Sequence, residues 1–168
     1  MKRILLLSDT HNHLDEQILA HCREADEIWH AGDIGTTAVA DRLSSIKPLK
    51  AVWGNIDNDQ LRMQFDEFLI FNCEEVKVMI THIAGPFGKY SEKVRAFLKQ
   101  EHPQLFICGH SHVLKVQRDN AYGALYINPG AAGHHGFHHV RTMIRFLIDG
   151  SKVLNMEVIE LGKRGRLA

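Results

Sequence analysis

The sequence predicts an α/β protein built on a mixed sheet or on two stacked sheets. In the first two thirds of the chain, short apolar runs alternate with segments that repeat apolar residues at helical spacing. After His112 only strand-like runs follow, and two pairs of them are separated by short polar turns. Strand–helix alternation is typical of parallel pairing, and short turns between strands are typical of antiparallel hairpins.

The N-terminal part alternates three strands with two helices. We expect strands over 3–8, 27–30 and 49–53, because continuous apolar runs of this length are typical of strands buried on both faces. A helical pattern begins at Leu14 and recurs at Ile18, Leu19 and Cys22, and a second helix is expected over 37–46.

The remaining elements are mostly strands. We expect strands over 65–72, 76–81 and 105–108, and a helix over 91–100 that Ser91 caps. The C-terminal part adds strands over 113–118, 124–128, 141–148 and 152–161. The last two are joined by Asp149-Gly150-Ser151, a hairpin signal.

Length and charge limit the classes of function. At 168 residues we expect a single domain over 1–168, with a short basic tail at about 162–168. Twenty basic and twenty acidic residues balance to zero, so strong nucleic-acid binding and membrane-surface binding are not expected. The first apolar run is too short for a signal peptide or a membrane span, and three scattered cysteines without a CxxC pair suggest reduced thiols. We therefore predict a cytoplasmic protein.

Polar side chains follow five of the predicted strands, close to the point where each strand ends. Because the carboxyl ends of parallel strands converge on one crevice, we expect these side chains to lie together. Glycine directly precedes three of them, which lets the backbone turn sharply beside a ligand. Seven of these residues form a mixed nitrogen and oxygen donor set without a thiolate: Asp9, His11, Asp33, Asn55, His82, His110 and His112.

This donor set points to transition-metal chemistry. Two carboxylates, one amide and four imidazoles suit Mn, Fe, Zn, Co or Ni, and not an all-oxygen Ca²⁺ site or a structural cysteine–zinc site. Seven donors are too many for one ion and suit two ions that share a carboxylate. Paired ions about 3.5–4 Å apart are a recurring device for in-line displacement at phosphorus. The pattern therefore predicts a two-metal site that acts on a phosphate ester.

The motifs resemble those of the calcineurin-like metallophosphoesterases. They read Asp9-x-His11, Gly32-Asp33, Gly54-Asn55-x-Asp57, Thr81-His82 and Gly109-His110-Ser111-His112, in that superfamily's order. The short chain, the Asn128-Pro129-Gly130 turn and the C-terminal hairpin are similar to its small YfcE-type phosphodiesterases. The retromer small subunit shares the fold. The resemblance extends from residue 3 to about residue 161.

The resemblance implies a four-layer α/β/β/α sandwich of two mixed β-sheets flanked by helices, with a dinuclear centre at the strand ends. It implies hydrolysis of a phosphate diester by a hydroxide that bridges two divalent ions, with manganese expected first and Ni, Zn, Fe or Co as alternatives. Asp9, His11 and His112 would hold the first ion. Asn55, His82 and His110 would hold the second, and Asp33 would bridge both. Asn55 and Asp57 are the candidate catalytic residues, since Asn55 would also contact the phosphate and Asp57 matches a carboxylate that mainly orients its neighbours.

Two positions depart from the family pattern. Larger phosphatases of this superfamily carry histidine directly after the motif asparagine, whereas this chain has Ile56, which leaves the general acid unassigned. The small phosphodiesterases also lack that histidine. Ile83, Ala84 and Gly85 follow His82 where the family usually has glycine directly, so this loop is expected to shape a different pocket.

Other histidines and the tail have ordinary interpretations. His30 is expected to be a core residue at a strand end, with a supporting role at the site as the alternative. His13, His21 and His102 are expected on the surface without partners. The cluster His134–His139 is expected to be a flexible solvated loop, and the alternative is a loop that overhangs the site. Lys163, Arg164 and Arg166 are expected to form a frayed, solvated end, and Cys108 to fill the core.

Two classes of function remain open on the sequence. The first is a metal-dependent phosphodiesterase acting on a small molecule, with a phosphomonoesterase as a close alternative that the absent histidine at Ile56 disfavours. The second is a non-catalytic scaffold of the same fold that binds partner proteins. The complete donor set favours the enzyme. The sequence names neither the substrate nor the oligomeric state, although a dimer or tetramer is typical of such relatives.

Overall fold

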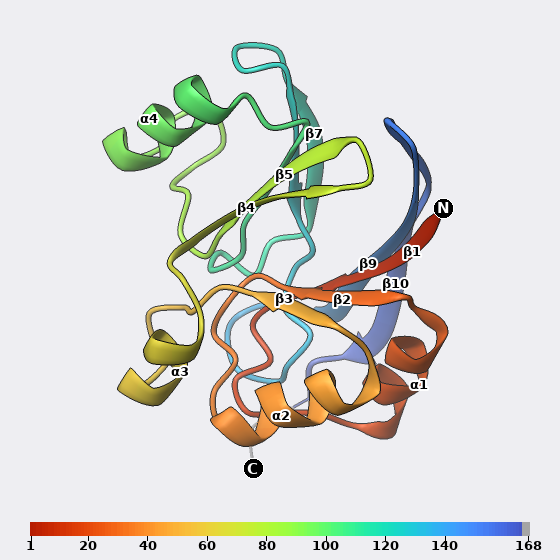
Figure 1. The fold of residues 1–168 in the computed structure, drawn as a ribbon. Helices are drawn as coiled ribbons and strands as arrows, with labels where there is room; N and C mark the ends of the chain where they lie inside the picture. Colours follow the sequence, from red (N-terminus) through yellow and green to blue (C-terminus); the bar gives the residue numbers. More distant parts are fainter. Residues whose placement is uncertain (166–168) are drawn as a thin grey trace.

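Two five-stranded sheets pack face to face in the computed structural model, which describes residues 1–165 (Figure 1). The first sheet has the order β10-β9-β1-β2-β3, with β1 (Lys2–Leu7), β2 (Glu27–His30), β3 (Leu49–Ala51), β9 (Val140–Asp149) and β10 (Lys152–Lys163). The second has the order β4-β5-β6-β8-β7, with β4 (Phe68–Cys73), β5 (Val76–Thr81), β6 (Leu105–Ile107), β7 (Lys115–Asp119) and β8 (Ala124–Asn128).

Helices cover the outer faces of the two sheets. Helices α1 (Glu16–Glu24) and α2 (Thr37–Ile46) pack on the first sheet, and α4 (Glu92–Glu101) packs on the second (Figure 1). A third apolar core lies between the sheets, where Trp29, Ile80 and Phe146 are buried. The arrangement is the four-layer α/β/β/α sandwich that the sequence resemblance implied.

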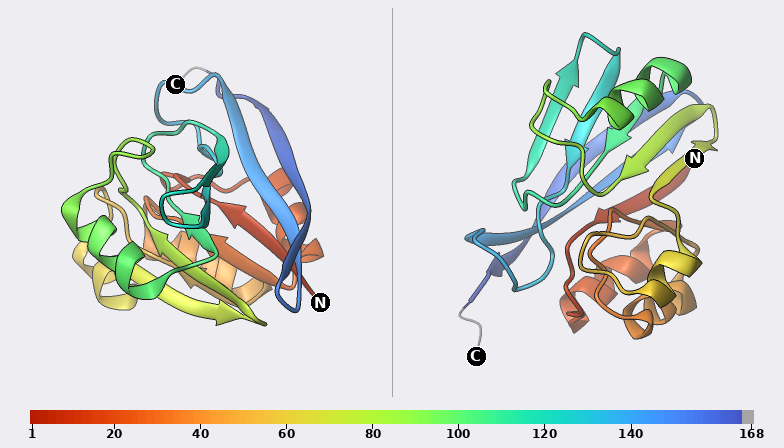
Figure 2. Two further views of the ribbon diagram at one scale, coloured as in Figure 1. Left: turned by 90° about the horizontal axis from the view of Figure 1, so that it is seen from above. Right: turned by 90° about the vertical axis from the view of Figure 1, so that its left-hand side faces the viewer.

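Both sheets are mixed, and their parallel strands position the site. In the first sheet β1 pairs in parallel with β2 and β2 with β3, whereas β9 is antiparallel to β1. In the second sheet β5, β6 and β8 are parallel neighbours. The views in Figure 2 show the two sheets as separate layers whose connecting loops gather at one end. Five strand ends can therefore deliver side chains to one place.

Most predicted elements are present within two residues, and three details differ. The structure contains a helix that the sequence analysis missed, α3 (Asp59–Gln64), which buries only Leu61 and so shows no apolar periodicity. Because Phe65 caps α3, the next strand begins at Phe68 and not at residue 65. Strand β10 continues to Lys163, so the start of the predicted basic tail belongs to the sheet. Residues 166–168 of that tail lie outside the described part of the chain.

The three cysteines are free thiols in the core, as their number and spacing suggested. Cys22, Cys73 and Cys108 are buried and unpaired. Burial raises the pKa of the Cys108 thiol to about 12, so it stays neutral as core filling. Among residues 1–165, no helix is long and apolar enough to cross a membrane.

Candidate metal centre

The structure brings six of the seven predicted ligands into two clusters at the carboxyl ends of the strands. Asp9 and His11 follow β1 and Asp33 follows β2, whereas His82 follows β5 and both His110 and His112 follow β6. Ligand atoms of Asp9, His11 and His112 lie within 4.8 Å of one another, and so do those of Asp33, His82 and His110. These are the two groups that the motif order assigned to two ions, apart from Asn55.

The two clusters share a boundary at the two aspartates. The Nε2 atom of His82 lies 3.1 Å from Oδ2 of Asp33 and 3.8 Å from Oδ1 of Asp9. The Nε2 atom of His11 lies 3.4 Å from Oδ2 of Asp33 and 3.7 Å from Oδ1 of Asp9. One oxygen of Asp33 thus lies between an imidazole of each cluster, the position that a bridging ligand requires.

Each buried aspartate divides its two oxygens between the fold and the centre. Oδ2 of Asp9 accepts hydrogen bonds from the Ser8 hydroxyl (2.6 Å) and the His110 backbone N–H (3.1 Å). Oδ1 of Asp33 accepts from the Ile56 backbone N–H (3.1 Å). The remaining oxygen of each carboxylate faces the imidazoles. The fold therefore fixes both carboxylates while leaving one oxygen of each free to bind a cation.

The histidines present nitrogen atoms that lack hydrogen-bond partners. Nδ1 of His82 donates to the Ala31 carbonyl oxygen at 2.7 Å, which in the neutral ring leaves a lone pair on Nε2. That lone pair points toward carboxylate oxygens, an unfavourable contact unless a proton or a cation lies between them. Nε2 of His11 and Nε2 of His82 are both buried without a hydrogen bond. Proteins commonly orient a metal-binding histidine by a hydrogen bond from its other ring nitrogen to a carbonyl oxygen. The donor set at this site therefore fits divalent cations.

The electrostatics of the cluster favour positive charge. Burial acts to raise the pKa of Asp9 and Asp33, but the imidazoles of His11, His82 and His112 outweigh it and hold the pKa of both carboxyls well below its usual range. Burial acts to lower the pKa of His11, and the two carboxylates overcome this and raise it to about 9. Two ionised carboxylates in a buried site require compensating cations, which protons or metal ions supply.

The backbone at the centre is strained. Asp9, His11, Asp33, His110 and His112 all have positive φ, between 44° and 70°. Residues other than glycine rarely adopt this conformation, although asparagine, aspartate and histidine do so more often than the rest, and it clusters at functional sites because surrounding structure has to maintain it. Here it aims side chains of three short loops, after β1, β2 and β6, toward one point.

Two of the glycines predicted to allow close approach do so by lacking a side chain. A Cβ atom on Gly54 would lie 2.1 Å from Oδ1 of Asp33, and one on Gly109 would lie 2.2 Å from Oγ of Ser8. Any larger residue at either position would displace a carboxylate or its hydrogen-bond donor. Gly54 lets the ends of the neighbouring strands β3 and β2 approach within the first sheet, and Gly109 lets the end of β6 approach the end of β1 in the other sheet.

The two candidate catalytic residues occupy different environments. Asn55 is exposed and lines a cavity of about 530 Å³ together with His11, Asp33, His110 and His112. Asp57 is buried, and its carboxylate accepts from the backbone N–H groups of Gly54 (2.8 Å), Gly35 (2.9 Å) and Ile34 (3.1 Å). Asp57 therefore orients the loops that carry Asp33 and Asn55 and does not line the cavity.

His30 supports the same loops from inside the core. It is fully buried, its Nε2 lies 3.0 Å from the Thr10 hydroxyl, and its Nδ1 accepts from the Gly32 backbone N–H at 3.1 Å. The Thr10 hydroxyl donates onward to the Ile34 carbonyl, so it accepts from His30. This network requires the neutral ring, and burial lowers the pKa of His30 to about 4. His30 is thus a core residue, as expected, that also joins the loops bearing Asp9 and Asp33.

The histidine cluster after residue 133 overhangs the centre, which is the alternative that the sequence left open, while His135 and His139 remain exposed to solvent as expected. The His135 ring stacks on His11 with centroids 4.7 Å apart, and the His138 ring lies edge-on to His112 at 5.2 Å. The His135–His139 segment forms the far wall of the 530 Å³ cavity, and Phe137 is 98% exposed at its rim. Periodicity could not show this, because the segment is fixed by long-range contacts.

Those contacts come from the residues expected to fray. Arg164 donates from its guanidinium to the carbonyl oxygens of His138 (2.9 Å) and His134 (3.4 Å). His13 also has partners that the sequence analysis did not foresee: its Nε2 lies 2.9 Å from Oδ2 of Asp15, and its ring lies edge-on to His134. A buried arginine was also missed, Arg141, whose guanidinium is the partner of Asp15. An arginine near the start of a largely apolar strand was the available signal for it.

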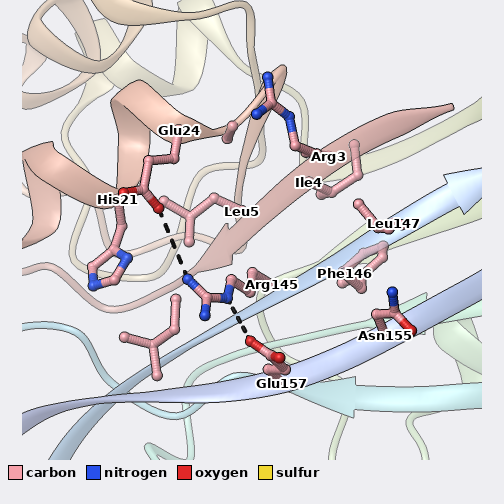
Figure 3. Close-up of a pocket in the computed structure, with 12 residues that line it drawn as sticks. Arg3, Ile4, Leu5, His21, Glu24, Arg145, Phe146, Leu147, Asn155 and Glu157 are labelled. Atoms are coloured by element: carbon pink, nitrogen blue, oxygen red, sulfur yellow. Dashed lines mark hydrogen bonds and ion pairs between the residues drawn. The ribbon is translucent and has the colours of Figure 1, made fainter.

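A separate cavity of about 370 Å³ lies away from the centre, between α1 and strands β1, β9 and β10 (Figure 3). It contains none of the predicted site residues. Figure 3 shows Arg145 pointing between Glu24 and Glu157, and its Nε lies 2.7 Å from Oε2 of Glu157. Because this arginine already has acidic partners, the cavity offers no comparable reactive group.

Comparison with known proteins agrees with the motifs. Residues 1–151 match the model of the calcineurin-like phosphoesterase superfamily domain. A probable metallophosphoesterase of Methanocaldococcus jannaschii is 28% identical over 131 residues, which are 75% of this chain and 66% of that relative's length. Vps29 of Entamoeba histolytica complexed with zinc superimposes with a TM-score of 0.73 at 16% identity, covering 94% of this chain and 98% of that one. A structure described as a novel archaeal phosphodiesterase has a TM-score of 0.70 at 20% identity and covers 95% and 99%. At these identities the structural likeness shows the fold.

Proposed function

The chain belongs to the calcineurin-like phosphoesterase superfamily, and from that membership we propose that it is a phosphodiesterase that uses two divalent metal ions. The membership supports a metal-dependent phosphoesterase. The observation that carries the finer proposal is the orientation of His82, whose Nδ1 is bonded to a carbonyl while its Nε2 faces Asp33 and Asp9. In this geometry a ring nitrogen faces two carboxylates, and the contact is favourable only when a cation or a proton lies between them.

The residues that would hold the ions are those of the two clusters. Asp9, His11 and His112 would bind one ion, His82, His110 and Asn55 the other, and Asp33 would contact both. When bound, divalent ions supply a hydroxide nucleophile at neutral pH and offset the negative charge that develops on the phosphate. Manganese is the first ion to test, because the carboxylate and amide oxygens of this set suit it, whereas the imidazoles also suit Zn, Ni or Fe.

The chain's own residues then orient the reactants. Asn55 lines the cavity beside Asp33 and can donate from its side-chain amide to a phosphate oxygen. The backbone bonds to Asp57 hold the loop that carries Asn55. In the overall reaction a bond forms between phosphorus and the oxygen of water, and the bond to one alcohol breaks. The departing alcohol takes up the proton that the water loses.

A diester is favoured over a monoester by the residue after Asn55. Ile56 is 46% exposed beside the cavity and has no proton to donate. A monoester with a poor leaving group depends more on a protein acid than a diester with a good one, so the absence of histidine here favours diesters. The wall formed by His135–His139 narrows the cavity on its other side.

The test is hydrolysis of bis(p-nitrophenyl) phosphate by chelator-stripped protein, before and after addition of Mn²⁺, Ni²⁺, Zn²⁺ or Mg²⁺. We expect metal-restored cleavage that exceeds cleavage of p-nitrophenyl phosphate. Asp33→Asn should abolish it and lower the bound metal from two ions per chain to at most one. Asp41→Asn, at an exposed position of α2, is the matched control and should keep both.

Each other outcome points elsewhere. Faster cleavage of the monoester would identify a phosphomonoesterase. Two bound ions without turnover of either substrate would reject the enzyme and favour the protein-interaction scaffold that the sequence left open. One ion per chain with full diester cleavage would reject the two-metal part of the proposal.

A further inference from the structure

A second cavity adjoins the metal centre and is apolar. It measures about 410 Å³ and lies between the loop after β5 and the start of β7. Its walls are Ile83, Pro86, Phe87, Val113, Lys115 and Tyr126. It shares His110, Ser111 and Val113 with the 530 Å³ cavity that holds the centre, so the two cavities are neighbours along these residues. Its volume lies near the lower end of the range of about 300–1,000 Å³ typical of small-molecule sites.

The loop that builds this cavity is the segment that departs from the family pattern. Ala84 is buried, and its carbonyl oxygen accepts from the Ser91 backbone N–H at 3.1 Å. The Lys89 backbone N–H donates to the Pro86 carbonyl oxygen at 2.9 Å. The inserted residues therefore form a turn with its own hydrogen bonds, and the cavity wall is formed before any ligand arrives.

Aromatic packing fixes the back of the cavity. The Phe87 ring lies edge-on to Tyr126, with centroids 5.1 Å apart and an interplanar angle of 84°. It is also edge-on to Tyr90 at 6.3 Å. The Lys115 ammonium lies over the Phe87 ring, 4.7 Å from its centroid. These contacts hold the Phe87 and Tyr126 rings in place, and rings fixed in a cavity wall can form further offset or edge-on pairs with an aromatic group of a ligand.

The mouth of the cavity exposes apolar side chains beside a charged centre. Ile83 is 46% exposed and Val113 is 60% exposed. Burying this apolar surface against a ligand is favourable in proportion to the apolar area that is buried. The polar centre a few residues away would bind the phosphate of the same ligand. An apolar cavity beside a polar centre suits a molecule whose phosphate is bonded to an apolar ring system or lies close to such a ring.

We propose that this cavity binds one organic arm of the phosphodiester, and that this arm ends in an aromatic ring. The proposal rests on the proposed function, since the phosphate of the same molecule would lie at the metal centre. His110 and Ser111 line both cavities, so they would border both parts of the ligand. The Ile83–Gly85 departure from the family pattern is thus a specificity element.

Two phosphonates that cannot be hydrolysed test the proposal. Phenylphosphonate and methylphosphonate share the charged group and differ only in the arm. Each is titrated into the zinc-loaded protein, and the methyl signals of isoleucine, valine and methionine are followed by NMR. We expect phenylphosphonate to bind about tenfold more tightly than methylphosphonate, from the apolar area that the ring buries. The ring should shift the signals of Ile83 and Val113, while that of Met63, 89% exposed on α3, stays in place.

Isosteric variants complete the test. Val113→Thr keeps the shape and adds a hydroxyl to the wall, so the ratio of the two dissociation constants should fall toward one. Val158→Thr, at a 46% exposed position of β10 outside both cavities, should leave the ratio unchanged.

The outcomes separate this proposal from the function. Three results would overturn the proposal that this cavity binds the organic arm. They are equal affinities for the two phosphonates, binding of neither phosphonate at millimolar concentration, and ring-current shifts at Val140 in place of Ile83. Metal-dependent cleavage of bis(p-nitrophenyl) phosphate would still support the phosphodiesterase in each of those cases. Conversely, the expected shifts in a protein without turnover would keep the ring-binding cavity and reject the enzyme.

Discussion

Arg164 donates from Nε to the carbonyl oxygen of His138 at 2.9 Å, which joins the end of the last strand to the loop over the metal centre. The Arg164 backbone N–H also donates to the His139 carbonyl oxygen at 2.9 Å. Arg164 therefore supports, from outside the cavity, the segment that forms its wall. That segment places His135 against His11 and His138 against His112.

Arg164→Ala should loosen this wall without emptying the centre. We expect faster amide hydrogen exchange across 134–139, bound metal unchanged, and a fall in kcat/KM of about three- to tenfold, because the substrate loses part of its positioning. Lys163→Ala at the exposed neighbouring position is the control and should change none of these. Unchanged exchange in Arg164→Ala would contradict the anchoring part of this argument.

Asp9→Asn keeps the size of the side chain and removes its charge. Since Oδ1 of Asp9 faces His112 at 3.1 Å and His11 at 3.7 Å, we expect loss of the ion at that cluster. Activity should fall by at least about a hundredfold, the scale seen when metal-site groups are removed. Metal analysis and diester hydrolysis measure both effects, and circular dichroism checks the fold. Full activity would reject Asp9 as a ligand.

Gly54→Ala should damage the site through crowding. Its Cβ would lie 2.1 Å from Oδ1 of Asp33, so either the carboxylate or β3 has to move. We expect a loss of about 1–3 kcal/mol in the free energy of unfolding, together with weaker metal binding. Gly123→Ala meets no atom within 4 Å and suffers only from its φ of 65°, so it should leave metal binding intact. Denaturation by urea and metal titration separate the two variants.

His30 makes stability fall in mild acid. Its pKa is about 4 in the folded protein, below the ordinary value of 6.5, so the unfolded chain takes up a proton first. The stability that neutral His30 provides is complete above pH 6.5 and is lost as the pH falls toward 4. We expect a contribution to this loss of about 2–3 kcal/mol. His30→Gln should reduce the pH dependence of unfolding in chelator-stripped protein by that amount, and an unchanged slope would contradict it.

Asp15 combines a helix cap with an ion pair, and two variants separate them. Its Oδ1 accepts from the Ile18 backbone N–H at 2.9 Å, and its Oδ2 accepts from the nearly buried Arg141 at 2.7 Å. Asp15→Asn retains the cap, and it should lower the free energy of unfolding by about 1–2 kcal/mol because Arg141 loses its carboxylate partner. Asp15→Ala loses both and should cost about 1 kcal/mol more. Equal costs in urea denaturation would show that the cap contributes nothing.

The sequence predicted the strand-end motifs and their convergence because both follow from local pattern. Apolar runs define strands, and the carboxyl ends of parallel strands meet at one edge, so Asp9, Asp33 and His82 could be placed together without coordinates. The same reasoning predicted that Gly54 and Gly109 allow close approach, and in the structure a Cβ atom at either position would overlap a neighbouring side chain.

The features that sequence analysis missed depend on long-range contacts. Helix α3 buries a single side chain, so it has no period to detect. The loop containing His135 was expected to be mobile because its own residues specify no structure, and its order comes from Arg164 about thirty residues later. The neutral state of His30 follows from Thr10 and Gly32, which pattern alone does not bring beside it.

The donors of the centre come from both halves of the sandwich. Asp9 and Asp33 follow strands of the first sheet, and His82 and His110 follow strands of the second. A cation held by both is a cross-link that exists only while the two layers are assembled, so it binds the native chain and not the unfolded one. Each tenfold rise in free cation above its dissociation constant should then raise the free energy of unfolding by about 1.4 kcal/mol per ion. We therefore expect the thermal midpoint of the protein to rise with the concentration of free metal, and we expect chelation to act on this fold much as reduction acts on a disulfide-bonded one.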